Sequence, residues 1–367
     1  MLKLSLVPPA PEDYRINGVA PEKQIVPIGQ QTWQVAWDKR LQLQIENTGD
    51  QATTAVLVFD GNPTMTDYPY VRDRATGEWR PLAGVRDGNM VLIAVPAPPG
   101  ITDFSVSPPY SYEDCAQMIR RIAEDHRVTV SVPGQSAEGR DLWLLKIAAP
   151  DCPDRLQGLK QKCMIAARAH AWETAGSYCI EGMLDYLLSD HPRAAMYLQM
   201  FDVYFCPMLN PDGVANGVRR HTPDGADLNR DIPTNRTRGT GCENDPELVC
   251  HIRLIDELRP QIYCQIHNMN QKHIDCALGM LPDHAEYFKN FMPPLQAHLK
   301  TLGFDQGGAG TIPKYCRNLD PACLSSTFEF PWFGRTTGNM RALGPPVLEA
   351  LFNTRIRADQ RKPAKSS

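Results

Sequence analysis

A histidine and a glutamate separated by two residues are the first side chains in this sequence that could do chemistry. They are His170 and Glu173, and they follow the apolar run 163–167, which we expect to be a strand. This spacing lets an imidazole nitrogen and a carboxylate oxygen reach one cation from a single turn. Because H-x-x-E occurs by chance in many proteins, the motif alone is weak support for a metal site.

A second histidine, His267, closes another apolar run at 261–266. Together with His170 and Glu173 it makes a His–Glu–His set. Three protein ligands leave the fourth tetrahedral position free for water, which is typical of catalytic zinc rather than structural zinc. The sequence therefore predicts a catalytic zinc site.

Apolar strand-like runs alternate with longer helical patterns through the second part of the chain. Ser111 with Asp114 forms a capping-box pattern that predicts the start of the first helix. Strands are predicted over 162–167, 201–208 and 261–266, and helices over 175–188, 245–258 and 283–302. This order predicts an α/β fold, a mixed sheet flanked by helices, with ligands bound beyond the carboxyl ends of the strands.

The first 106 residues have a different pattern. Alternating runs such as 41–45 and 53–59 are separated by Gly, Asn and Asp turns, and further strand candidates lie at 33–37, 78–82 and 90–95. They predict a small all-β sandwich. The prolines at 96–99 and 108–109 mark a boundary, so we expect a sandwich domain over 1–106 and a catalytic domain over 107–367.

The net charge and the cysteine content limit the partners and the cellular compartment that we expect for this protein. The net charge of −4 gives no global positive field for nucleic acid or an anionic membrane. The amino end is broken by Pro8 and Pro9, which is too early for a secretory or membrane-spanning segment. Eleven cysteines without a C-x-x-C pair favour a reducing compartment. We expect a cytoplasmic protein that binds neither nucleic acid nor membrane.

Two further motifs make the chain recognisable, at 207–213 (PMLNPDG) and at 225–230 (GADLNR). With the H-x-x-E they resemble the M14 zinc carboxypeptidases, most of all the cytosolic carboxypeptidase (deglutamylase-like) branch. The resemblance covers roughly residues 107–355 and extends more loosely over the sandwich. It implies a peptide hydrolase with one Zn²⁺ per chain that acts on the C-terminal tails of peptides or proteins.

The resemblance also implies roles for individual residues. It assigns zinc to His170, Glu173 and His267, and it makes Asp227 the residue that orients His170. Asn229 and Arg230 match the pair that grips the substrate's terminal carboxylate.

Two catalytic roles complete the expected site. Arg220 falls where the family keeps the arginine that stabilises the oxyanion. A base is also needed beside the zinc-bound water. Glu329 stands in the apolar and hydroxylic run 325–331, where a carboxylate is costly to bury unless it has a function or a partner, and it matches the family's catalytic glutamate.

In the family, the fifteenth residue before the catalytic glutamate lies at the floor of the pocket for the substrate's terminal side chain. In this sequence that residue is Lys314. A cation at that floor predicts a preference for C-terminal glutamate or aspartate. The chain departs from the digestive members at Ala171 and Trp172, where they carry an arginine, and it lacks a clear match to their mobile tyrosine, for which Tyr315 is a substitute by conjecture.

Two rival functions remain at this point. The same metal site could serve a zinc-dependent deacylase of N-acyl amino acids, or an amidase of cell-wall peptides. Alternatively, the chain is a non-catalytic binding module with a vestigial site, a reading that the presence of Glu329, Arg220 and all three ligands disfavours.

Overall fold

The structure is a computed structural model, and it divides into two compact units. It describes residues 1–7, 23–36, 40–60, 68–149, 159–218, 220–232, 245–269, 276–280, 299–302, 312–332 and 334–360. The first unit consists of Met1–Pro109 with Ala215–Arg219 and Trp332–Asn339, and the second of Tyr110–Val214, Arg220–Pro331 and Met340–Ser367. The division into domains at residue 106 remains our proposal.

The first unit contains two five-stranded sheets, ordered β1-β4-β10-β6-β7 and β2-β3-β5-β9-β8. Their strands are β1 (Leu2–Leu6), β2 (Ile25–Gly29), β3 (Thr32–Val35), β4 (Gln42–Asn47), β5 (Thr53–Phe59), β6 (Tyr70–Arg72), β7 (Trp79–Pro81), β8 (Gly84–Asp87), β9 (Met90–Ala97) and β10 (Gly100–Ser105). Every second residue of β4, β5 and β9 is buried, which follows from the period-two pattern in the sequence. β3 pairs with β5 in parallel, whereas the other strand pairs described in this unit are antiparallel.

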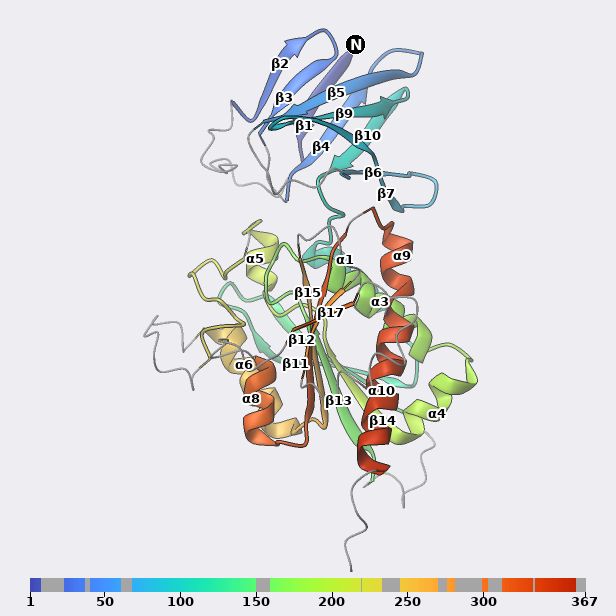
Figure 1. The fold of residues 1–367 in the computed structure, drawn as a ribbon, viewed down its shortest axis with the longest axis vertical. Coiled ribbons are helices and arrows are strands. Elements are labelled where there is room, and N and C mark those ends of the chain that lie inside the picture. The colour runs from blue at the N-terminus through green and yellow to red at the C-terminus, as the bar shows by residue number, and fades with distance from the viewer. Residues whose placement is uncertain are drawn as a thin grey trace, which may run out of the picture. The chain divides into compact units, whose positions relative to one another are not determined.

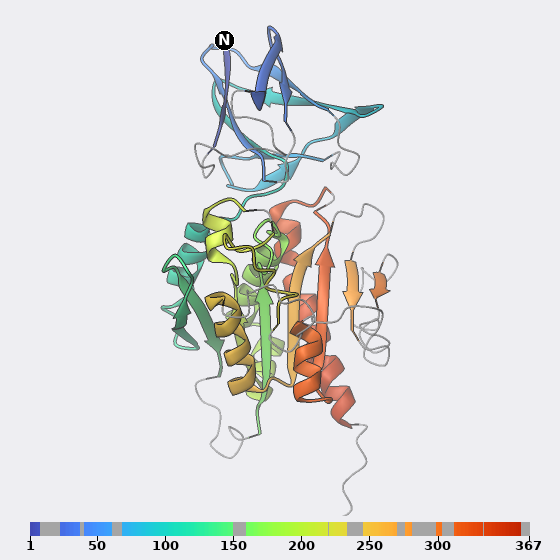
Figure 2. The ribbon, with the colours of Figure 1, turned by 90° about the vertical axis from the view of Figure 1, so that its left-hand side faces the viewer.

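The second unit is built on an eight-stranded mixed sheet, ordered β11-β12-β14-β13-β15-β18-β16-β17. The strands are β11 (Val128–Gln135), β12 (Asp141–Ile147), β13 (Gln161–Ala167), β14 (Phe201–Cys206), β15 (Ile262–Asn268), β16 (Cys276–Gly279), β17 (Leu299–Leu302) and β18 (Leu324–Phe330). The four central strands, β14, β13, β15 and β18, are parallel. Their carboxyl ends therefore meet at one edge of the sheet, as the α/β prediction requires (Figure 2).

Helices cover both faces of this sheet (Figure 1). The helices of the described residues are α1 (Tyr112–Ile122), α3 (Ala175–Leu187), α4 (Pro192–Met200), α5 (Pro211–Ala215), α6 (Pro246–Leu258), α8 (Ile312–Leu319), α9 (Thr337–Ala342) and α10 (Gly344–Gln360). α6 and α8 lie on one face and α3, α4 and α10 on the other. The capping box of Ser111 and Asp114 at the start of α1 is confirmed. Where α3 passes the end of α9, a Cβ on Gly182 would clash with the Arg341 carbonyl oxygen, so only glycine fits.

One helix prediction is wrong in part. Residues 299–302, the end of the helix expected over 283–302, form β17, which pairs in parallel with β16. A segment of only four residues, here Leu-Lys-Thr-Leu, fits either structure, and pairing with β16 decides it. The earlier part of that predicted helix lies outside the described residues.

Candidate metal centre and active site

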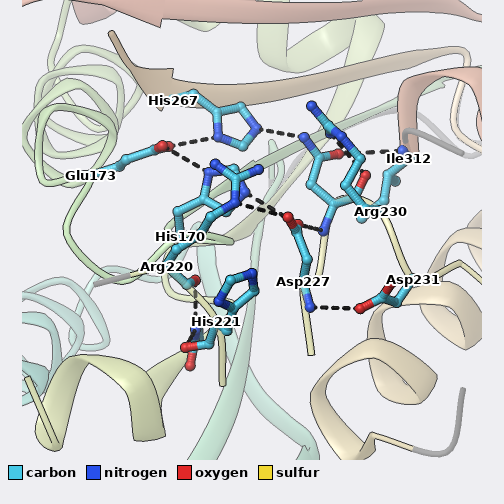
Figure 3. A network of polar contacts seen from close by, with 11 residues as sticks. His170, Glu173, Arg220, His221, Asp227, Arg230, Asp231, His267 and Ile312 are labelled. Atoms are coloured by element: carbon cyan, nitrogen blue, oxygen red, sulfur yellow. Dashed lines mark hydrogen bonds and ion pairs between the residues drawn. The ribbon is translucent and has the colours of Figure 1, made fainter. Parts of the chain in front are cut away.

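The three expected metal ligands converge at the carboxyl ends of two neighbouring strands. His170 and Glu173 lie in the turn between β13 and α3, and His267 lies on β15, which pairs with β13. Their ligand atoms all lie within 4.8 Å of one another. Glu173 joins the two imidazoles, with Oε1 2.7 Å from His170 Nδ1 and Oε2 2.6 Å from His267 Nδ1 (Figure 3). All three residues are buried.

The second nitrogen of each imidazole has a polar partner. His170 Nε2 lies 3.3 Å from Asp227 Oδ1, and His267 Nε2 lies 3.3 Å from the side-chain amide of Asn229. Such partners fix the orientation of a ligating imidazole and leave the other nitrogen for the metal. Two Nδ1 atoms and one carboxylate fit the donor set of catalytic zinc, and Asp227 and Asn229 orient the two imidazole rings through their Nε2 atoms.

The electrostatics of the three ligands also suit a cation. Burial raises the pKa of Glu173, but His267 and His170 outweigh this effect and lower it to about 2. Burial lowers the pKa of His170, but Glu173 and Asp227 outweigh this effect and raise it to about 9. For His267 the burial effect dominates, and its pKa is lowered. The ionised Glu173 thus attracts positive charge, which a proton on His170 or a metal ion can supply.

Glu329 stands beside the ligands on the next strand. β15 and β18 run parallel, and His267 is the register partner of Glu329. Burial raises the pKa of Glu329 to about 8, and the charge of Glu173 acts in the same direction. The positive charges of His170, Arg230 and Arg220 partly oppose this shift, so all of them lie within electrostatic reach of the carboxylate. A half-buried carboxylate with a raised pKa beside a cation site is suited to proton transfer.

Asp227 joins the ligand His170 to Arg220. Its Oδ2 accepts a hydrogen bond from Arg220 Nε at 2.8 Å, while its Oδ1 faces His170 (Figure 3). Burial opposes ionisation of Asp227, but His170 and Arg220 outweigh it and hold its pKa far below the usual range. Arg220 is thus tied to the site, and its side chain is 37% exposed, so it can still face a ligand.

The sequence of this region matches a family model, and the fold of the chain matches solved structures. Residues 115–274 match the zinc carboxypeptidase family model. Residues 115–274 belong to an M14 zinc carboxypeptidase domain. The fold resembles that of a metallo-carboxypeptidase from Burkholderia cenocepacia, with a TM-score of 0.76 and 20% identity, over 98% of this chain and 100% of that one.

Curated relatives of the zinc carboxypeptidase domain include cytosolic carboxypeptidases. Cytosolic carboxypeptidase 2 of Xenopus tropicalis is 31% identical over 169 residues, which are 45% of this chain and 17% of that protein. Human cytosolic carboxypeptidase 6 is 42% identical over 98 residues, which are 26% of this chain and 19% of that protein. The chain therefore spans less than a quarter of the length of these two relatives.

The two expected carboxylate-binding residues lie next to the ligands. Asn229 is buried, and besides its contact with His267 its Oδ1 lies 3.5 Å from the backbone nitrogen of Ile312, at the start of α8. Arg230 is half-buried, and its Nη1 donates to the carbonyl of Asn229 at 3.1 Å. The zinc carboxypeptidase domain thus brings both together with the three ligands, and their role toward substrate remains a prediction.

Lys314 is placed differently. It is half-buried on α8, two residues after Ile312. Ile312 and Cys316 pack into the core of the sheet, and the helical period places Lys314 on the opposite side of α8 from them. Among the described contacts, none joins Lys314 to the other candidate residues. Its place in a side-chain pocket therefore remains a prediction. The hydroxyl of Tyr315, the conjectured substitute tyrosine, donates to Asp256 of α6 at 2.8 Å.

Two further residues of this region, which the sequence motifs do not indicate, hold the site in place. Asn268, after the ligand His267, accepts a hydrogen bond from the Ala175 backbone nitrogen at 2.9 Å and so fixes the start of α3. Arg168, two residues before His170, is almost fully buried. A charged residue inside the apolar run 163–171 was the signal available for Arg168.

Proposed function

We propose that the protein is a zinc-dependent carboxypeptidase that hydrolyses the last amide bond of peptides or protein tails and prefers a terminal glutamate or aspartate. The convergence of His170, Glu173 and His267, with Glu329 in register beside them, is the observation that carries this proposal. The names of the curated relatives support a cytosolic peptide hydrolase. Among the described residues, no helix is long and apolar enough to cross a membrane.

Each side chain of the site has a task in this hydrolysis. His170, Glu173 and His267 would hold the zinc ion, which would supply Lewis-acid chemistry and make water acidic enough to attack near neutral pH. Glu329 accepts a proton from the attacking water and returns it to the departing amine. Arg220, oriented by Asp227, stabilises the negative charge on the scissile carbonyl oxygen. The proton count of the hydrolysis balances, because the proton that water gives to Glu329 leaves on the departing amine.

Substrate orientation falls to Asn229 and Arg230. The guanidinium of Arg230 is charged and planar, which suits a carboxylate, and it lies within electrostatic reach of His267 and Glu329. A terminal carboxylate bound there presents only the final amide bond to the ligands, which explains cleavage at the end of a chain.

The acidic preference rests on Lys314, whose ammonium would attract a side-chain carboxylate. We expect Lys314→Ala to lower the ratio of kcat/KM on glutamate-ended over leucine-ended peptides by about 10-fold or more. Lys162→Ala is the matched control, because Lys162 is also half-buried but lies at the opposite end of β13 from the ligands. An unchanged ratio in Lys314→Ala would refute the pocket assignment.

A peptide library varied at its last residue tests the activity itself. With zinc, we expect release of single C-terminal residues, fastest for glutamate and aspartate, and we expect a chelator to abolish it. Acylated amino acids should be cleaved slowly or not at all. The deacylase alternative predicts the reverse order. Stoichiometric zinc binding without hydrolysis of any substrate would favour a non-catalytic module.

A further inference from the structure

Arg168 is a buried arginine at the base of the metal-binding turn. It directly follows β13 and precedes His170 by two residues, and it is 2% exposed. Its backbone φ of 61° lies in the left-handed region, which residues other than glycine rarely adopt. A strained backbone and a buried charge at one residue both cost free energy, so the surrounding structure must compensate for them.

The side chain of Arg168 grips the backbone of the turn itself. Its Nε and Nη2 both donate to the Ala171 carbonyl oxygen, at 3.1 and 2.6 Å. Ala171 lies between the ligands His170 and Glu173. Two donors on one oxygen fix the direction of that peptide group, and with it the separation of the two ligands on either side.

The third guanidinium nitrogen of Arg168, Nη1, connects the turn to the residues around it. Arg168 Nη1 donates to the Tyr110 carbonyl oxygen at 3.0 Å and to Ser177 Oγ of α3 at 3.1 Å. None of the ion pairs among the described residues includes Arg168. Its hydrogen-bonding partners are neutral acceptors, and burial lowers its pKa to about 10. The guanidinium thus serves as a set of directed donors and not as half of an ion pair.

The backbone of Arg168 extends the same network to the other side of the site. Its carbonyl oxygen accepts from the Asn210 backbone nitrogen at 3.1 Å, and the Asn210 side chain donates to the His221 carbonyl at 3.0 Å. His221 follows Arg220, which is paired with Asp227. One residue therefore connects the turn that carries two ligands with the segment that carries Arg220.

We propose that Arg168 is a positioning residue for the metal centre, which sets the spacing of His170 and Glu173 through the Ala171 carbonyl. The proposal rests on the proposed zinc function. Metal–ligand distances in well-formed sites lie within about 0.2 Å of their standard values, so we expect loss of the two hydrogen bonds to Ala171 to weaken zinc binding before it unfolds the domain. A lysine keeps the charge but offers no planar fork.

Zinc affinity of the purified full-length chain, measured by competition with a chromogenic chelator, tests this proposal. We expect Arg168→Lys to weaken zinc binding about 10- to 100-fold, the range seen when groups that support metal ligands are removed. Thermal unfolding of the zinc-free proteins, recorded in parallel, separates this effect from a general loss of stability.

Arg355→Lys is the matched control. Arg355 is also buried and donates to a backbone carbonyl, that of Ala322, and to Gln161 at the start of β13. The two arginines therefore lie at opposite ends of one strand. We expect Arg355→Lys to lower the unfolding temperature and leave zinc affinity unchanged. Equal losses of affinity in both variants, or none in folded Arg168→Lys, would overturn the proposal.

Ser177→Ala keeps the inference testable if Arg168→Lys does not fold. This change removes one acceptor of Arg168 and leaves the guanidinium in place. We expect a smaller loss of zinc affinity, about 2- to 5-fold, and a changed absorption spectrum of the cobalt-substituted protein. If Arg168→Lys is unfolded and Ser177→Ala has wild-type affinity and spectrum, the proposal fails. A wild-type chain that binds no zinc would instead refute the proposed function together with this inference.

Discussion

His267 and Glu329 are register partners on two adjacent parallel strands, β15 and β18. The pairing places a proposed metal ligand and a proposed base side by side at the carboxyl edge of the sheet, although they are 62 residues apart in the sequence. Rigid strands hold the two groups, so neither needs a loop movement to reach the other. Base and ligand are therefore already arranged before substrate binds.

Replacement of this base should abolish turnover and spare the metal. We expect Glu329→Gln to lower kcat by about 10²- to 10⁴-fold, because the amide cannot accept a proton from water. KM and zinc affinity should change little. Steady-state kinetics and chelator competition on the same preparation measure both. A variant that loses zinc in proportion to its activity would show that Glu329 acts on the metal centre and not as a base.

Removal of the proposed metal ligand His267 should abolish zinc binding itself, unlike replacement of Glu329. In His267→Ala we expect zinc binding to fall below detection at micromolar metal, since two ligands remain. Zinc that binds the folded state raises the unfolding temperature of the wild-type protein, and this rise should vanish in His267→Ala. His251→Ala is a control for loss of a buried histidine, because His251 pairs with the hydroxyl of Tyr263 near the amino end of β15. Should His267→Ala still be stabilised by zinc, the ligand set is wrong.

The Asp227 carboxylate contacts both His170 and Arg220, and its replacement should affect both residues. We expect Asp227→Asn to weaken zinc binding about 10- to 100-fold through His170, and to lower kcat further because Arg220 loses its ionic partner. Asp231→Asn is the matched control, since the Asp231 carboxylate accepts from the Asp227 backbone nitrogen at 2.8 Å and contacts neither His170 nor Arg220 in the described structure. Equal effects of both changes would mean that Asp227 acts only through local backbone structure.

Glu247 predicts a pH dependence of stability outside the metal centre. It is 2% exposed at the start of α6, and the hydrogen bonds assigned among the described residues include none to its carboxylate oxygens. Burial, followed by the charge of Asp245, raises its pKa to about 8. Above the unfolded pKa of about 4.3 the folded state binds more protons than the unfolded state. The stability contributed by the neutral carboxyl is therefore lost as pH rises from about 4 to about 8.

Glu247→Gln tests whether ionisation of this carboxyl destabilises the folded state as pH rises. We expect the variant to be more stable than the wild-type protein at pH 8 by about 1–3 kcal/mol, with the difference shrinking toward pH 5. Urea unfolding at several pH values measures it. Glu257→Gln, an exposed glutamate on the same helix, should show no such trend. A Glu247→Gln variant that is less stable at pH 8 would show that the ionised carboxylate has a stabilising partner.

Local signals in the sequence were sufficient for the parts of the site that lie close together in the chain. The spacing of His170 and Glu173, the apolar strands that end near His170 and His267, and the capping box at Ser111 each follow from a few neighbouring residues. Periodicity also separates the strand-rich first unit from the α/β second unit. These features are encoded locally, because strand and helix periods and caps depend on residues within one or two turns.

Only the tertiary structure decided which distant residues meet. The order of the sheet places β18 beside β15 and thus Glu329 beside His267, and no local pattern specifies that order. Pairing with β16 turns 299–302 into a strand, against the helix that the sequence favours. The burial of Arg168 and its grip on Ala171 likewise depend on Tyr110 and Ser177 closing around it. Long-range pairing and packing outweigh local preference at these positions, because burial and strand pairing contribute more free energy than propensity does.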